Sequence, residues 1–168
     1  VNTGNIYKNN SFLFKHHYDI GQKDSLITDS VTIKLFYPRL RLEHTFRFTG
    51  SDYLFQDIYV DSIRYLAYFN YKTANNVPIY FRDRWSDMGN EFSLISFPEK
   101  TNQSQFLKLS IALQNLNGKF DTIATTSLYN IATSAEYRNR TRNQVWDIEA
   151  TGQLYLNGFN AGDYAAYI

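Results

Sequence analysis

Six arginines stand at alternate positions in two segments, and this spacing is the clearest candidate for a binding surface. They are Arg39, Arg41, Arg47, Arg138, Arg140 and Arg142. Alternate side chains of an extended strand share a face, so each group would form a basic stripe able to meet phosphates or carboxylates. The acids Glu43, Glu136 and Asp147 bring both stripes close to neutral. We therefore expect a salt-bridged face, on the surface or between subunits, rather than a nucleic-acid site.

A second candidate contact lies at Trp85, with Tyr80 nearby. Aromatic rings cover the apolar faces of sugars, and tyrosine hydroxyls add polar ends. Trp85 stands among charged residues in 82–91, which we expect to be a loop, whereas Trp146 alternates with Ile148 and is expected in the core. Glycan binding at Trp85 is therefore an alternative function.

The histidines and acids form no regular metal site. His16 and His17 are adjacent, which directs them to opposite faces of a strand, and His44 is distant in sequence. Four oxygen-bearing side chains gather in the 82–91 segment: Asp83, Asp87, Asn90 and Glu91. Their spacing is not that of a calcium loop, so a solvated acidic loop is expected.

Motifs of catalysis are absent from the sequence. There is no nucleophile elbow, zincin helix, Walker loop or dinucleotide fingerprint, and with no cysteine there is no thiolate chemistry. A pair of catalytic carboxylates on distant strands leaves no local motif, so a glycoside-active enzyme stays a third alternative. We expect no enzyme activity, no cofactor and no metal ion.

Composition favours one β-rich domain over 1–168. The 168 residues include 14 Tyr and 13 Phe, a bias toward strand formers. The 17 Lys and Arg nearly balance the 16 Asp and Glu, so a net charge of +1 gives no general attraction to nucleic acid. No apolar run reaches the roughly 18–20 residues of a membrane-spanning helix, and no membrane insertion is expected.

The strongest structural pattern is the alternation in 105–129. Aliphatic residues occupy every second position of its first half: Leu107, Leu109, Ile111 and Leu113. Asn117 and Gly118 then supply the dipeptide that favours a two-residue hairpin turn. The segment predicts a hairpin that turns at Asn117 and Gly118 and has one buried apolar face.

Shorter patterns predict the remaining elements. Strands are expected at 11–18, 31–37, 39–48, 77–81, 92–97, 145–150 and 153–156. Residues 53–71 favour two strands, with a helix as the competing interpretation. Loops or turns are expected at 19–29, 49–52, 74–76 and 82–91, and a short helix at 133–137. About ten short strands predict an antiparallel two-sheet sandwich or jelly roll. Its core would also include Ile33, Leu35, Phe46 and Trp146.

Both ends of the chain are predicted to be polar terminal arms, at 1–10 and 158–168. Scattered apolar anchors could be covered by a neighbour: Ile6, Tyr7, Phe159, Tyr164 and Tyr167. Such arms often add to the sheet edge of another subunit. The expected function is a non-enzymatic assembly subunit of a virion (capsid, tail or baseplate) or of a surface filament. Its partners would be copies of itself or neighbouring assembly proteins.

Overall fold

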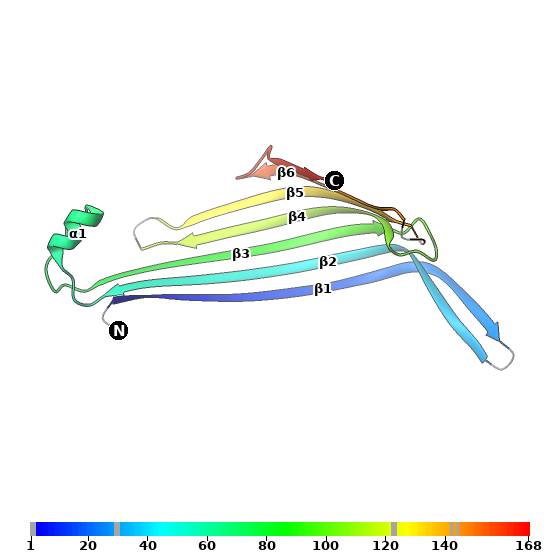
Figure 1. Cartoon of the computed structure of the whole chain (residues 1–168), viewed down its shortest axis with the longest axis horizontal. Helices are drawn as coiled ribbons and strands as arrows, with labels where there is room; N and C mark the ends of the chain where they lie inside the picture. Colours follow the sequence, from blue (N-terminus) through cyan, green and yellow to red (C-terminus); the bar gives the residue numbers. More distant parts are fainter. Residues whose placement is uncertain (1–2, 29–30, 122–123, 142, 144) are drawn as a thin grey trace. The chain divides into compact units, whose positions relative to one another are not determined.

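The protein forms a single antiparallel sheet. The computed structural model describes residues 3–28, 31–121, 124–141, 143 and 145–168. In this part of the chain seven strands pair in the order β1-β2-β3-β4-β5-β6-β7, so each strand lies beside its neighbours in sequence (Figure 1). The all-β prediction is confirmed. The predicted two-sheet sandwich or jelly roll of about ten strands is wrong, because the described strands form only one layer.

Long strands replace the short ones predicted. The elements are β1 (Thr3–Thr28), β2 (Val31–Asp57), α1 (Ser62–Phe69), β3 (Ile79–Ser96), β4 (Gln105–Lys119), β5 (Thr126–Arg140), β6 (Asp147–Gly158) and β7 (Tyr164–Tyr167). The first two strands hold 26 and 27 residues, against a usual length of about 3–10. The segments 49–52 and 82–91 and the predicted helix at 133–137 lie inside strands, as does most of 19–29. Pairing with neighbouring strands outweighs the local turn propensity of these residues.

The chain divides into two compact units, and each is described by itself. Unit 1 consists of Val1–Phe12, Phe48–Asp87 and Leu116–Ser127. Unit 2 consists of Leu13–Arg47, Met88–Asn115 and Leu128–Ile168. Strands β1 to β5 contribute residues to both units.

In unit 1, Gly118 does not make a turn. Asn117 and Gly118 lie within β4, and Gly118 is not among the glycines of positive φ. The predicted two-residue turn and its pairing register are therefore wrong. A Cβ on Gly118 would lie 2.6 Å from both Trp85 Cζ3 and Phe120 Cε2. Glycine is needed here because two aromatic rings approach the backbone closely.

Residues 53–71 contain the helix α1, so the helical interpretation is the correct one beyond Asp57. The Asp61 carboxylate caps the helix by accepting hydrogen bonds from the backbone N–H groups of Ile63 (3.0 Å) and Arg64 (3.2 Å). Asn70 ends it in the left-handed conformation. No helix in the described ranges combines the length and apolar character needed to span a membrane.

Most residues predicted to form the core are exposed. Leu109, Ile111 and Trp146 expose 50%, 53% and 64% of their surface. Leu107, Leu113 and Ile33 are exposed as well, and Leu35 and Phe46 are half-buried. The described buried apolar residues are Val60, Ile79, Ile95, Phe97 and Ala132. The core prediction assumed a second layer, and a single sheet leaves one face without cover.

The predicted terminal arms are largely strands. Residues 3–10 begin β1, and Tyr164–Tyr167 form β7, which pairs with β6 from Thr151 to Leu154. The first two residues lie outside the described part of the chain. The arm prediction is thus wrong for the described N-terminal residues and for β7, because backbone pairing to a neighbouring strand orders them.

Candidate functional site: the two faces of unit 2

One face of unit 2 carries an almost continuous apolar surface, here called the apolar band. Its members are Phe14, His16, Tyr18, Leu42, His44, Phe46, Phe92, Leu94, Leu107, Leu109, Ile111, Leu113, Tyr129, Ile131, Ala135, Tyr137, Ile148, Leu154 and Leu156. Alternation along each strand places them together, and it is interrupted between β5 and β6 by a register shift at Ile131 and Ala132 that passes over Leu156. No Lys, Arg, Asp or Glu stands at the alternate positions between them within each described strand.

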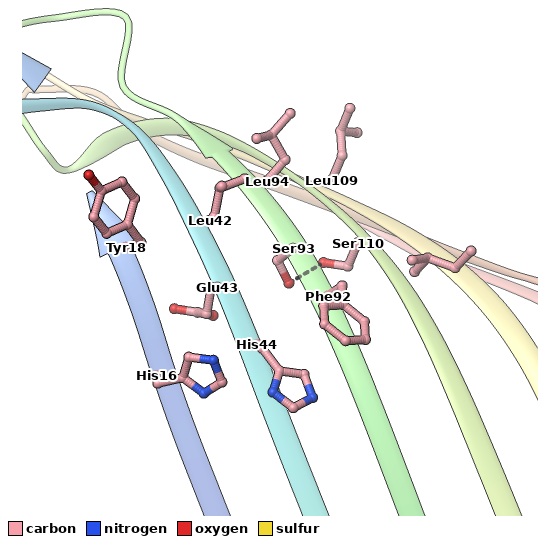
Figure 2. A pocket seen from close by; sticks show the side chains of 11 residues that line it. His16, Tyr18, Leu42, Glu43, His44, Phe92, Ser93, Leu94, Leu109 and Ser110 are labelled. Atoms are coloured by element: carbon pink, nitrogen blue, oxygen red, sulfur yellow. Dashed lines mark hydrogen bonds between the residues drawn. The ribbon is translucent and has the colours of Figure 1, made fainter. Parts of the chain in front are cut away.

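Ring contacts tie three neighbouring strands together within this band. Figure 2 shows His16 of β1, His44 of β2 and Phe92 of β3 on one side of the sheet. The ring centroids of His16 and His44 lie 5.0 Å apart, and those of His44 and Phe92 lie 4.4 Å apart. His44 Nε2 is 3.3 Å from Asn90 Oδ1. The structure thus brings into contact two histidines that lie far apart in the sequence.

Two further observations bear on this pair of histidines. His16 and His44 line an open hollow of about 560 Å³ together with aliphatic side chains such as Leu42 and Ile111. Among the described residues, no cluster of three or more His, Cys, Asp or Glu could hold a metal ion.

The opposite face, here called the polar lining, carries the charged side chains. Its members include Lys15, Asp19, Arg41, Glu43, Glu91, Ser93, Lys108, Ser110, Gln114, Asn130, Ser134, Glu136, Arg138, Arg140, Asp147 and Gln153. Glu43 is the centre of an ion-pair network, and its side chain is only 4% exposed. Lys15 Nζ lies 3.0 Å and Lys108 Nζ 3.6 Å from Glu43 Oε1, and Lys108 also pairs with Glu91 at 3.0 Å.

Hydrogen bonds between strands complete the polar lining. Ser93 Oγ and Ser110 Oγ are 3.0 Å apart, and both residues are buried (Figure 2). Asn130, 1% exposed, accepts a hydrogen bond from the backbone N–H of Asn160 and donates one to Gln114 Oε1. These buried polar groups are satisfied within the protein, as burial requires.

The charged groups of the lining stabilise one another's ionised forms. Burial raises the pKa of Glu91, but the hydrogen bond from Lys108 and its charge outweigh burial, so the pKa falls below its ordinary value. Burial likewise opposes the charge of Lys108, and the Glu91 contact raises the pKa of Lys108 overall. Arg41 forms two hydrogen bonds to Asp19, at 2.6 and 2.9 Å, and they lower the pKa of that carboxyl. These groups are charged at neutral pH.

The arginine stripes of the sequence fall on this polar lining. Arg41 meets Asp19, and the Nε atoms of Arg138 and Arg140 lie 3.7 and 3.6 Å from the Asp147 carboxylate. Arg39 and Arg47 share the face of Arg41 by alternation in β2. Arg142 lies outside the described residues.

The proposed glycan contacts lie in unit 1. Trp85, in β3, packs against Phe120 with ring centroids 6.2 Å apart and lines a hollow of about 420 Å³. Tyr80 is exposed and is not among the residues that line that hollow. Trp85 and Tyr80 therefore do not line the same hollow. The apolar anchors of the predicted arms lie elsewhere: Ile6 and Tyr7 in β1, Tyr164 and Tyr167 in β7, and Phe159 just after β6.

Sequence reasoning missed the ion-pair network around Glu43. Alternation indicates only the face of each member: Lys108 alternates with the aliphatic residues of β4, and Glu43 with Leu42 and His44 in β2. Which of these residues pair depends on the register between strands. We find no match to this chain among protein-family models, among curated proteins or among solved structures. The candidate site therefore depends on its own geometry.

Proposed function

We propose that unit 2 is part of a membrane-embedded sheet whose apolar band contacts lipid acyl chains. The polar lining faces water, as the wall of an aqueous path for polar solutes. The role is structural rather than catalytic. The observation that carries the proposal is the separation of the two faces: Lys, Arg, Asp and Glu side chains cluster on the polar lining, and the apolar band has none of these four residue types.

The exposure of the two faces is the reverse of that in a water-soluble sheet. Leu109 and Ile111 are half exposed, whereas their neighbour Ser110 is 6% exposed. Apolar surface left in water costs about 25 cal/mol per Å². A band of this extent therefore needs an apolar partner, and acyl chains supply one without directional contacts.

Along β5 and β6 the length of the band fits a bilayer. In β5 it runs from Tyr129 to Tyr137 and in β6 from Ile148 to Leu156, nine residues in each case. A strand tilted by about 45° crosses the hydrocarbon region with about 9–11 residues. Tyrosines stand at both ends of the β5 stretch, where amphipathic rings favour the two membrane interfaces.

A second copy of the chain is the main competing cover for the band. Specific protein interfaces have a polar rim and about one hydrogen bond per 100–200 Å². The charged side chains of the central strands of unit 2 lie on the opposite face, so they do not rim the band or set a register for a partner. This arrangement favours a fluid lipid surface over a fixed protein partner.

The proposal sets a requirement at the sheet edges. Backbone groups without hydrogen bonds are costly in hydrocarbon. The free edges of β1 and β7 must therefore be paired with strands beyond those described, from the same protein or from another copy.

The expectation of no membrane insertion arose because alternating strands never produce a long apolar run. The virion, surface-filament and glycan-binding roles remain predictions from the sequence, and the geometry favours none of them.

The absence of native cysteine makes a direct test possible. Ser134→Cys and Ala135→Cys place a nitroxide label on the polar lining and on the apolar band at adjacent positions of β5. In phospholipid vesicles, the label at 135 should collide with oxygen, which concentrates in lipid, and be shielded from a charged nickel chelate. The label at 134 should show the reverse.

Equal access of the nickel chelate to both labels would contradict the proposal. A label at 135 shielded from both reagents, together with a doubled mass by light scattering, would assign the band to a second copy instead.

A further inference from the structure

Unit 1 contains an aromatic hollow that plays no part in the proposed membrane role. It measures about 960 Å³ and lies between α1 and the strand ends that flank it. Seven aromatic rings surround it: Phe55, Tyr59, Tyr65, Tyr68, Phe69, Tyr71 and Phe81. Tyr59 and Tyr68 expose 66% and 78% of their surface, so a ligand can reach them.

A buried carboxylate fixes one wall of the aromatic hollow. Asp57 is 6% exposed and accepts hydrogen bonds from Tyr65 Oη (2.8 Å), Thr3 Oγ1 (2.9 Å) and the backbone N–H of Tyr59 (3.2 Å). The Tyr65 contact lowers the pKa of Asp57 below its ordinary value. Burial, and then the Asp57 carboxylate, raise the pKa of Tyr65 to about 12. Asp57 is therefore a fixed negative charge beside neutral rings.

The charged groups of the lining favour a cation. Two carboxylates, Asp57 and Asp61, line the hollow against one guanidinium, Arg64, which leaves a net charge of −1. Asp61 also caps α1, which holds it in place. An anionic ligand would meet two fixed negative charges.

The angles between the rings distinguish a cage from a platform. Tyr65 and Tyr71 are inclined at 62° and Tyr71 and Phe81 at 78°, whereas Phe55 and Phe81 are nearly parallel at 21°. Sugar stacking needs one open, flat face, whereas rings at steep angles surround a ligand from several sides. Ring faces attract cations, and such cages recognise quaternary ammonium groups. We infer that the aromatic hollow binds an organic cation of the quaternary ammonium class.

The test compares choline with 3,3-dimethylbutanol, which has the same shape without the charge. The full chain is kept in a polyoxyethylene-ether detergent, which carries neither sugar nor ammonium groups, and binding is followed by calorimetry and tyrosine fluorescence. Choline should bind at least about tenfold more tightly than the neutral analogue, the discrimination expected of a desolvated cation–π site. Equal affinity, or binding of glucose in preference to choline, would overturn the inference.

Variants assign the effect to this hollow. Tyr71→Leu and Asp57→Asn should each weaken choline binding about tenfold. Arg64→Gln should strengthen it, because it removes the one cation of the lining. Tyr80→Leu changes an exposed tyrosine of β3 outside the hollow and should leave binding unchanged. If Asp57→Asn unfolds, Arg64→Gln still decides the question, since unchanged or weaker binding in that exposed variant contradicts the inference.

A quaternary ammonium group could come from a small solute or from a phosphatidylcholine headgroup. Vesicles of phosphatidylcholine and of phosphatidylglycerol distinguish these sources. If the headgroup is the ligand, free choline must compete with it for the hollow in phosphatidylcholine vesicles but not in phosphatidylglycerol vesicles. A free solute binds equally well in both.

Discussion

At the scale of single residues, Gly118 is the position where one added carbon has the clearest effect. Gly118→Ala places a Cβ 2.6 Å from Trp85 and Phe120, so the rings must shift. We expect a loss of about 1–3 kcal/mol in the free energy of unfolding, as for other overpacked sites. The control is Gly152→Ala, whose Cβ meets nothing within 4 Å. Denaturant titrations compare the two, and equal midpoints would show that the close approach is not limiting.

The Asp19–Arg41 pair predicts a pH dependence of stability. The hydrogen bonds from Arg41 lower the pKa of Asp19 in the folded state. A lowered carboxyl pKa stabilises the fold above the ordinary value of 3.8 and loses that effect as pH falls through the lowered one. Arg41→Gln should therefore destabilise the protein at pH about 7 and much less at pH about 2. Arg39→Gln, on the same strand face, is the control. A stability difference independent of pH would count against the ion pair.

At the scale of elements, the alternating strands predict opposite responses of the two faces to charge. Ile111→Lys places an ammonium group on the apolar band of β4. In lipid vesicles we expect a loss of about 2–4 kcal/mol, the cost of lysine near the bilayer midplane. Gln153→Lys adds the same charge to the polar lining of β6 and should cost less than about 1 kcal/mol. Denaturant unfolding from vesicles measures both, and similar costs would show that neither face contacts lipid.

The strands of unit 2 also show how much of the fold could be predicted from the sequence. The alternation in 107–113 correctly predicted which side chains of β4 share a face. Periodicity says nothing about what covers that face, so it predicts burial for aliphatic residues that are exposed in the described structure. Gly118 gave the signal of a turn because close ring approach and positive φ both select glycine. The network around Glu43 joins β1, β2, β3 and β4, and pairings at that separation leave no local signal.

At the scale of the whole molecule, the two unlike faces of unit 2 explain why polar side chains such as Glu43 and Ser110 are buried while Leu109 and Ile111 are exposed. The unlike faces predict how the chain associates with membranes. Because the net charge is only +1, attraction to anionic lipid contributes little, and burial of the apolar band supplies the free energy. We expect the purified chain to bind zwitterionic and anionic phospholipid vesicles equally and to stay bound in 1 M salt and alkaline carbonate. Flotation with its β circular dichroism retained is the measurement. A chain that remains in the aqueous fraction as a uniform dimer, or that is released by salt, would contradict the membrane assignment of the apolar band.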